Sequence, residues 1–373
     1  MRSVPKDVLR LWALFALAGL PLGLTISACD GDSSGTGGST STGGTTSTGG
    51  STSTGGTTGG GGVTGGGGAT TGGGGGTAGT GGMTGGSGGS LTPVEQRGQY
   101  LVDKVVYCSQ CHTPYDAAGL PDNTLYLAGN PNYVFPYMGS DVTLYAHNLT
   151  NSDLHGMASW SDDQIETAIV TGIDDEGAAL WPHMPYPAYA HLTPDDATAM
   201  VAYLRKVVAN EHAGMEASLA NPEPETPKLD DAQIPHTTLP AGDPDYQSAE
   251  KGRYLAIVAC LTCHTPESAP GVPDLSKAFA GGKSIRRVGD SVTYTSTNIT
   301  PDATGIAGWS ALDIGQAVKT NTEKSSARKL CPPMPGGPGR MGDMEQADLL
   351  DIGRYLSTIP PIQNGPFKCD PNQ

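Results

Sequence analysis

Two five-residue segments place a pair of cysteines directly before a histidine. They read C-S-Q-C-H at residues 108–112 and C-L-T-C-H at residues 260–264. C-x-x-C-H is typical of c-type haem attachment, in which two thiols reach the vinyl groups of one porphyrin and the next imidazole reaches the iron. The sequence therefore predicts two covalently attached haems c. The predicted attachment residues are Cys108, Cys111, Cys260 and Cys263, and the predicted proximal iron ligands are His112 and His264.

Two other chemistries use paired cysteines at this spacing, a redox dithiol and a zinc site. A Cys2His2 zinc site would need a further pair of ligands in each part of the chain, and no histidine follows His264. The histidine directly after each cysteine pair also favours haem over a dithiol. We therefore expect haem iron, and not zinc, at both segments.

The two segments lie in an internal repeat. The first copy contains R-G-Q-Y-L, N-L-T, W-S, H-M-P and A-Y-L-R, and the second contains K-G-R-Y-L, N-I-T-P, W-S, P-M-P and R-Y-L in the same order. Met184 follows His112 by 72 residues, and Met334 follows His264 by 70. A repeat of this length predicts one structural unit per copy. The predicted units are residues 91–212 and 246–373, joined by a proline-rich connector at 213–245.

The elements that must position these segments are predicted to be helices. Thr92-Pro93-Val94-Glu95 is typical of a helix start, Ser161 and Thr193 begin two further helices, and we expect Asp343 to cap the last one. No run of alternating β-branched residues is long enough for a sheet, so the predicted fold class is all-α. The apolar stripe of the helix that starts at Thr193 consists of Ala197, Met200, Val201, Leu204, Val207 and Val208.

The first 90 residues predict export and a tether. A basic segment precedes an apolar run at residues 11–24, which is shorter than the roughly 20 residues that span a bilayer. We therefore expect a cleaved signal peptide at residues 1–28 rather than a transmembrane helix. Residues 29–90 are almost wholly Gly, Ser and Thr after the initial Cys29-Asp30, as is typical of a disordered linker. The net charge of −16 argues against nucleic acid as a partner.

The end of the signal, Ile26-Ser27-Ala28-Cys29, resembles the lipobox of bacterial lipoproteins. This resemblance implies a lipid on Cys29, which would be the protein's one contact with the membrane. It implies a location on the periplasmic side of a bacterial membrane or at the cell surface, with inner and outer membrane both open. Cys331 and Cys369 then remain as an even pair in an oxidising compartment, which predicts a disulfide, with free thiols as the alternative.

Taken together, G-x-Y-L, C-x-x-C-H-T-P, N-[LI]-T, M-P and Y-L resemble the class I cytochrome c fold in tandem. The pattern is similar to the cytochrome subunit of membrane-associated alcohol and aldehyde dehydrogenases, although those subunits commonly carry three haem domains. The resemblance implies a crossing of the first and last helices, at Gly98 with Tyr203 and at Gly252 with Tyr355. It also implies Met184 and Met334 as distal iron ligands.

Other side chains compete for the distal positions. The alternatives are His183, Met138 and Met157 at the first haem, and Met341 and Met344 at the second. Trp160 and Trp309 occupy matching positions of the two copies, which fits the wall of a haem pocket and an ordinary core equally well.

These observations predict an electron carrier rather than an enzyme. Two irons with His and Met ligands have no open position for a substrate. The expected partners are a dehydrogenase, other cytochromes or a terminal oxidase. A dihaem peroxidase is the main alternative, but it needs two inequivalent haem sites, whereas the M-P elements are matched. A haem-based sensor is a further alternative, because His183 beside Met184 would permit ligand exchange.

Overall fold

The computed structural model describes most of the chain after residue 89. The described ranges are residues 90–116, 121–137, 140–212, 228–269, 271–286, 292–324 and 328–367. All of them fall within one compact unit. The predicted signal peptide, the lipidation site Cys29 and the linker up to residue 89 lie outside these ranges, as does Cys369. Within them, no helix is long and apolar enough to cross a membrane.

The first haem segment follows directly from the first helix. Helix α1 (Pro93–Tyr100) begins as predicted, because Thr92 and Glu95 form a capping box. It runs into a π-helical turn, η1 (Leu101–Val105), and then into the short helix α2 (Ser109–His112). The cysteine pair therefore follows two helical elements, after a short break at residues 106–108.

Three more helices complete the first half, residues 90–212. They are α3 (Asp162–Thr171), α4 (Tyr186–Tyr189) and α5 (Pro194–Leu204). The predicted starts are confirmed, because Ser161 caps α3 and Thr193 caps α5. Helix α5 ends earlier than its apolar stripe predicts, so that Val208 is 53% exposed while the other five stripe residues are buried.

The same order of helical elements recurs in the second half, residues 228–367. The elements are α6 (Tyr246–Ala256), the π-helical turn η4 (Ile257–Leu261), α7 (Thr262–His264), α8 (Ala311–Thr320) and α9 (Gln346–Thr358). Glu345 occupies the N-cap of α9, so the predicted cap at Asp343 was wrong. Asp343 instead accepts a hydrogen bond from the backbone N–H of Gly339. Short 3-10 turns are η2 (Asn123–Leu125), η3 (Asp231–Gln233), η5 (Leu275–Lys277) and η6 (Met341–Asp343).

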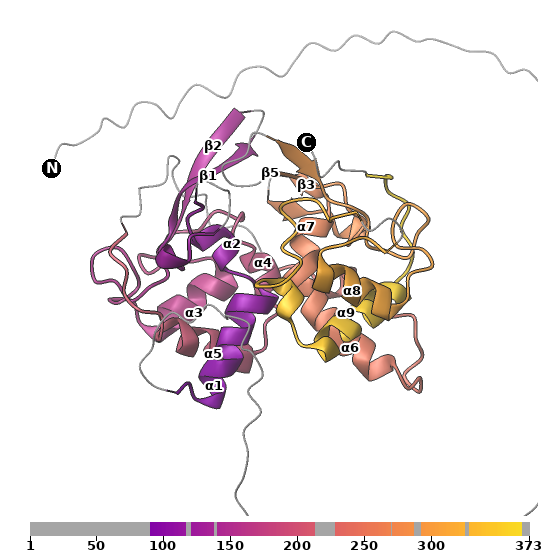
Figure 1. Ribbon diagram of the computed structural model, residues 1–373, viewed down its shortest axis with the longest axis horizontal. Helices are drawn as coiled ribbons and strands as arrows, with labels where there is room; N and C mark the ends of the chain where they lie inside the picture. The colour runs from indigo at the N-terminus through magenta and orange to yellow at the C-terminus, as the bar shows by residue number, and fades with distance from the viewer. Residues whose placement is uncertain are drawn as a thin grey trace, which may run out of the picture. The chain divides into compact units, whose positions relative to one another are not determined.

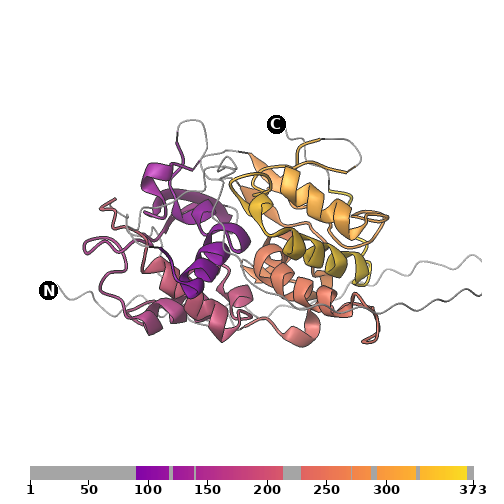
Figure 2. The same cartoon turned by 60° about the horizontal axis from the view of Figure 1, so that its bottom comes forward.

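Glycine permits the close crossing of the first and last helices in each half. A Cβ on Gly98 would lie 1.8 Å from the carbonyl oxygen of Ala199 and 2.8 Å from the Cβ of Tyr203, which confirms the predicted contact. A Cβ on Gly252 would lie 1.9 Å from the carbonyl oxygen of Asp351. Figures 1 and 2 both show α1 beside α5 and α6 beside α9. These two crossings position the helix ends that carry the cysteines.

The expectation that neither copy contains a sheet was wrong. Strand β1 (Asn130–Tyr137) pairs antiparallel with β2 (Ser140–Ala146), as seen in Figure 1. Shorter antiparallel pairs join β3 (Glu267–Ala269) to β4 (Val272–Pro273) and β5 (Ser284–Arg286) to β6 (Thr293–Thr295). Aromatic and β-branched residues are frequent in β1 and β2, which favours the extended backbone. Helices still form the core of each half.

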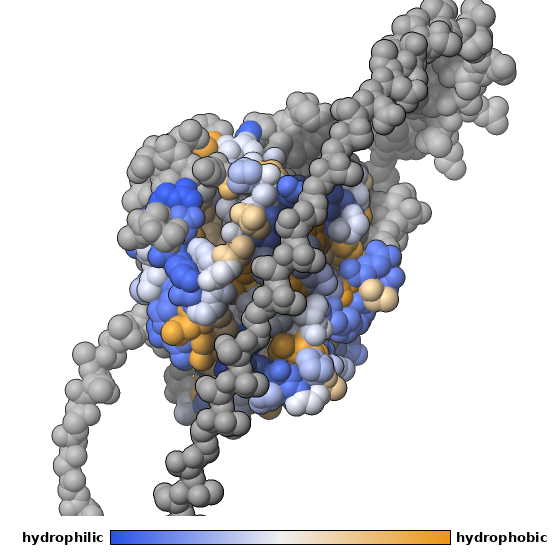
Figure 3. Space-filling view, turned by 90° about the vertical axis from the view of Figure 1, so that its right-hand side faces the viewer, coloured by the Kyte–Doolittle hydropathy of each residue, from blue (hydrophilic) through white to orange (hydrophobic). Residues whose placement is uncertain are grey.

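The last part of the predicted connector contacts both halves, because the backbone of Leu229 bonds to Pro187 and His191 of the first half. Leu229 and Ile234 are buried. The carbonyl oxygen of Pro235 accepts hydrogen bonds from the hydroxyl of Tyr355, at 2.6 Å, and from the guanidinium of Arg253. Among the described residues, the exposed large apolar side chains are Val94, Leu154, Val208, Val272 and Leu312. Figure 3 shows hydrophilic residues around small hydrophobic patches on one face.

Candidate functional site

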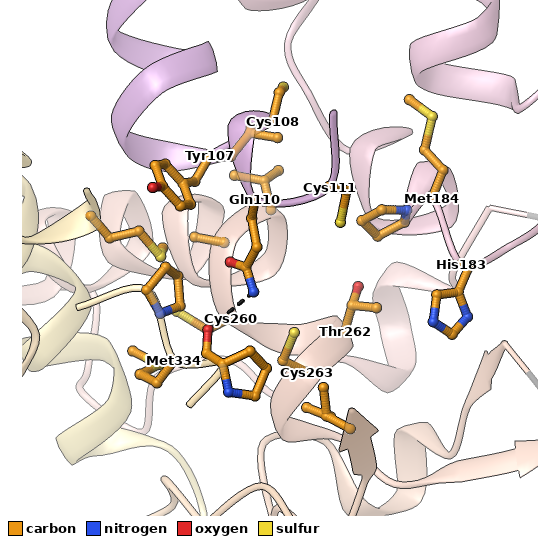
Figure 4. A pocket seen from close by; sticks show the side chains of 18 of the residues that line it. Tyr107, Cys108, Gln110, Cys111, His183, Met184, Cys260, Thr262, Cys263 and Met334 are labelled. Atoms are coloured by element: carbon orange, nitrogen blue, oxygen red, sulfur yellow. Dashed lines mark hydrogen bonds between the residues drawn. The ribbon is translucent and has the colours of Figure 1, made fainter. Parts of the chain in front are cut away.

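Both C-x-x-C-H segments line one cavity of about 1500 Å³. That volume exceeds the roughly 300–1,000 Å³ of a site for a single small molecule. Side chains from both halves form its wall, and Figure 4 shows several of them around the opening. All eight residues predicted to bind haem border it, namely Cys108, Cys111, His112, Met184, Cys260, Cys263, His264 and Met334. The structure therefore brings together every haem-binding residue that the sequence predicts.

π-Helical turns deliver the cysteines to the cavity in both halves. Such turns are rare and occur frequently at functional sites. In the first half, η1 is followed by Tyr107, whose φ of 53° lies in the left-handed region. In the second half, η4 contains Cys260 and continues without a break into α7. The two attachment segments thus reach equivalent places by slightly different backbone paths.

A backbone carbonyl orients each predicted proximal histidine. The Nδ1 atom of His112 lies 2.7 Å from the carbonyl oxygen of His147, and that of His264 lies 2.8 Å from the carbonyl oxygen of Thr297. A carbonyl only accepts, so Nδ1 carries the proton and Nε2 keeps its lone pair for a metal. Burial lowers the pKa of His264 and lowers that of His112 to about 4, so both rings are neutral.

The N-[LI]-T motifs hold these two carbonyls in place. The Oδ1 atom of Asn148 accepts from the backbone N–H and the hydroxyl of Thr150, and Asn298 does the same with Thr300. The other end of each amide donates to a carbonyl beyond the last helix, Asn210 in the first half. The sequence showed the recurrence of the motif but not its role, because the residue that orients the histidine acts through its backbone.

The two predicted distal methionines lie in equivalent turns. The backbone N–H of Met184 donates to the carbonyl of Trp181, and that of Met334 donates to the carbonyl of Cys331, both at 3.0 Å. Both side chains are half-buried and line the cavity. Two thioethers from equivalent turns therefore border the same cavity.

His183 does not share the direction of its neighbour. Figure 4 shows the side chains of Met184 and His183 extending in opposite directions. Burial and the nearby charge of Lys283, which belongs to the second half, lower the pKa of His183 to about 3. The imidazole borders the cavity but lies toward the second half, and this direction favours Met184 over His183 as a ligand for the first haem.

The other methionines considered as distal ligands are more deeply buried or lie outside the described residues. Met157, Met341 and Met344 are buried in the hydrophobic core, although their side chains reach the cavity wall. Met138 lies outside the described residues. The matched tryptophans Trp160 and Trp309 both border the cavity, and the ring of Trp160 lies 5.5 Å from that of His147.

The local chemistry does not suit a reactive dithiol. Burial raises the pKa of Cys108 and of Cys260 to about 12, whereas a redox-active dithiol needs a lowered thiol pKa. In the described ranges, no three His, Cys, Asp or Glu side chains are grouped so that they could hold a metal ion. A largely apolar cavity, paired thiols and a neutral imidazole at each segment fit a haem attached by two thioethers.

Cys331 is disulfide-bonded. Cys369, its predicted partner, lies outside the described residues, so the pairing stays a prediction.

Known proteins share part of this sequence. Residues 95–207 match the cytochrome c family. The chain is 27% identical to a dihaem cytochrome c-type protein of Cereibacter sphaeroides, over 69% of this chain and 83% of that protein. It is 29% identical to the fructose dehydrogenase cytochrome subunit of Gluconobacter japonicus, over 72% of this chain and 53% of the subunit.

A third relative is the cytochrome c subunit of the quinone alcohol dehydrogenase of Gluconobacter oxydans, with 27% identity over 72% of this chain and 55% of the subunit. The chain thus spans little more than half the length of the two dehydrogenase subunits. Residues 95–207 thus match the cytochrome c family, and the chain is similar to the cytochrome subunits of dehydrogenases.

Proposed function

We propose that the chain is an exported dihaem cytochrome c that carries electrons between a redox enzyme and a respiratory acceptor. The observation that carries this proposal is the single cavity bordered by both C-x-x-C-H segments and by both M-P methionines. The similarity to dehydrogenase cytochrome subunits supports it. The same similarity does not favour a dihaem peroxidase or a haem-based sensor.

Each haem would be held by residues of one half. Cys108, Cys111, His112 and Met184 would hold the first haem. The second haem takes the equivalent ligands, which are Cys260, Cys263, His264 and Met334. When bound, each haem supplies a one-electron iron couple.

Residues of the chain would set the reduction potential of that couple. The Nδ1–H bonds to the carbonyls of His147 and Thr297 fix the imidazole planes and raise the basicity of Nε2. A thioether on the opposite side raises the reduction potential relative to a second imidazole. With an imidazole and a thioether from the chain for each haem, no ligand position would be left for a substrate.

The remaining parts of the chain fit an exported carrier. We propose that Cys29 carries a lipid, that residues 29–90 form a tether, and that Cys331 pairs with Cys369 on the outer side of the membrane. A dehydrogenase is the proposed electron donor, and another cytochrome or a terminal oxidase the acceptor. The protein touches the membrane through its lipid alone, on the periplasmic side or at the cell surface.

A spectroscopic experiment on the purified full-length holoprotein tests the proposal. A pyridine haemochrome assay should return two covalent haems per chain, and the ferric Met-to-iron absorption band should account for both haems. A redox titration should show reversible one-electron steps without peroxide consumption. One haem per chain, absence of the band, or turnover of peroxide at an open iron would each contradict the proposed carrier.

A further inference from the structure

Two tyrosines reach across from one half to the other in a reciprocal way. The hydroxyl of Tyr100, at the end of α1, donates to the Oδ2 atom of Asp348 in α9 at 2.7 Å. The hydroxyl of Tyr254, in α6, donates to the Oδ2 atom of Asp196 in α5 at 2.6 Å. Each half therefore gives one tyrosine from its first helix and receives one at its last helix.

Each aspartate is also paired with a cation of its own half. Arg97 donates two hydrogen bonds to Asp196, at 2.8 and 2.7 Å. Lys251 donates to the other carboxylate, that of Asp348, at 2.5 Å. Each cation precedes the tyrosine of its helix by three residues, which places the two side chains on one helical face. Both aspartates are the third residue of their helices, where the helix dipole favours a negative charge.

Both aspartates are buried, so each carboxylate depends on its hydrogen-bond donors. Asp348 is 2% exposed and Asp196 is 8% exposed. A buried carboxylate that loses one of its donors pays most of the cost of its desolvation. Lys251 bonds to Oδ1 of Asp348 and the Tyr100 hydroxyl to its Oδ2. Arg97 bonds to both oxygens of Asp196, and the Tyr254 hydroxyl adds a second bond to Oδ2. The backbone N–H of Glu345, the N-cap of α9, donates in turn to the Tyr100 hydroxyl at 3.1 Å.

A further contact joins the halves beside the cavity. The side-chain amide of Gln110, which lies between the first pair of haem cysteines, donates to the carbonyl of Pro333 at 3.0 Å, as Figure 4 shows. Pro333 directly precedes Met334. The attachment segment of the first haem is thus tied to the distal loop of the second.

We propose that Tyr100 and Tyr254 are positioning residues that hold the two haem sites at one fixed separation, so that electrons exchange between them. The inference rests on the proposed dihaem function. Neither tyrosine borders the cavity, so their role is to position the two halves and not to bind haem. The R-G-Q-Y-L and K-G-R-Y-L segments then serve three purposes: a cation for the own half, a glycine for the helix crossing and a tyrosine for the other half.

The test compares the double variant Tyr100→Phe/Tyr254→Phe with the wild type and with Tyr355→Phe, all as full-length holoprotein. Tyr355 is a matched control, because its hydroxyl donates to Pro235 within the second half. Pulsed dipolar EPR on the ferric protein measures the iron–iron distance distribution. We expect a single narrow distribution in the wild type and the control, and a broadened one in the double variant. Electron exchange between the haems after rapid one-electron reduction should slow in the double variant alone.

Hydrogen exchange provides a second measurement that does not depend on haem. Loss of a hydrogen bond to a charged group should raise the local opening equilibrium about tenfold or more. In the double variant, the amide of Glu345 should therefore exchange faster than in the control. Equal exchange and equal distance distributions in the double variant and the control would overturn the inference. A haem count of one per chain would instead contradict the proposed dihaem function, and the exchange data would still decide the role of the tyrosines.

Discussion

The hydroxyl oxygen of Thr265 accepts a hydrogen bond from the backbone N–H of Phe279 at 3.1 Å. Phe279 has a φ of 63°, a conformation that costs free energy for a residue with a side chain. Thr113 and Leu127 repeat the arrangement in the first half, at 2.9 Å and a φ of 56°. The threonine of each C-H-T-P segment therefore stabilises the strained backbone of a residue 14 positions later.

Replacing this threonine should destabilise the second half. Thr265→Val keeps the shape of the side chain but leaves the N–H of Phe279 buried without its acceptor, which should lower the free energy of unfolding by about 1–3 kcal/mol. Thermal or denaturant unfolding of the holoprotein measures the change. Thr293→Val, on an exposed strand position, serves as the control and should have little effect. Equal stability of the two variants would contradict the assigned role.

A methyl group at either helix crossing should be strongly destabilising. In Gly98→Ala, the new Cβ would overlap the Ala199 carbonyl, and relief requires that α1 and α5 separate. We expect a loss of about 3 kcal/mol or more, with partial loss of the first haem. The control is Gly242→Ala, because nothing lies within 4 Å of a Cβ there. Denaturant unfolding and a haem count on both variants provide the measurement.

The distal ligand of the first haem can be tested with three variants. Met184→Leu should remove the ferric Met-to-iron band of one haem and lower its potential, because it removes the thioether. Met157→Leu changes a buried core methionine and should retain the band. His183→Ala should also retain it, since His183 lies toward the second half. If the band disappears in His183→Ala and persists in Met184→Leu, the assignment of the distal ligand is wrong.

Asp103 should make the stability of the first half depend on pH. Burial raises the pKa of Asp103 to about 6, although the Tyr126 hydroxyl donates to its carboxylate. Between about pH 4 and pH 6, the folded protein keeps a proton that the unfolded chain, with an Asp pKa of about 3.9, has released. Stability therefore falls as the pH rises through this window, by at most about 3 kcal/mol.

The Asp103→Asn variant removes this titration and should flatten that part of the stability curve. Asp153→Asn, at an exposed position, should leave the curve unchanged. Denaturant unfolding at several pH values gives both curves. An unaltered slope in Asp103→Asn would show that another group is responsible.

The parts of the site that the sequence predicted are those set by local chemistry. Spacing alone predicted a site at the cysteines and histidines, and these residues border one cavity. The caps at Thr92, Ser161 and Thr193 are local interactions of three or four residues. The last helix was misread at its start, because Asp343 and Glu345 are both acceptable near a helix N-terminus and only the fold selects between them.

Features that depend on distant contacts were not predictable in this way. The β1–β2 pair was missed because Pro131 and Pro136 interrupt the alternation of its first strand. The carbonyls of His147 and Thr297 act through the backbone, which carries no residue-specific signal. The hydroxyl of Tyr100 meets an aspartate 248 positions away, and nothing near Tyr100 in the chain indicates such a partner.

The reciprocal tyrosine contacts have the form found in a twofold homodimer, where each subunit gives what it also receives. In this protein the two partners are consecutive parts of one polypeptide. The connector at residues 213–245 sets an effective local concentration of one half at the other, so the association does not weaken on dilution. Two halves joined in this way keep their pairing at any expression level, as two separate chains would not.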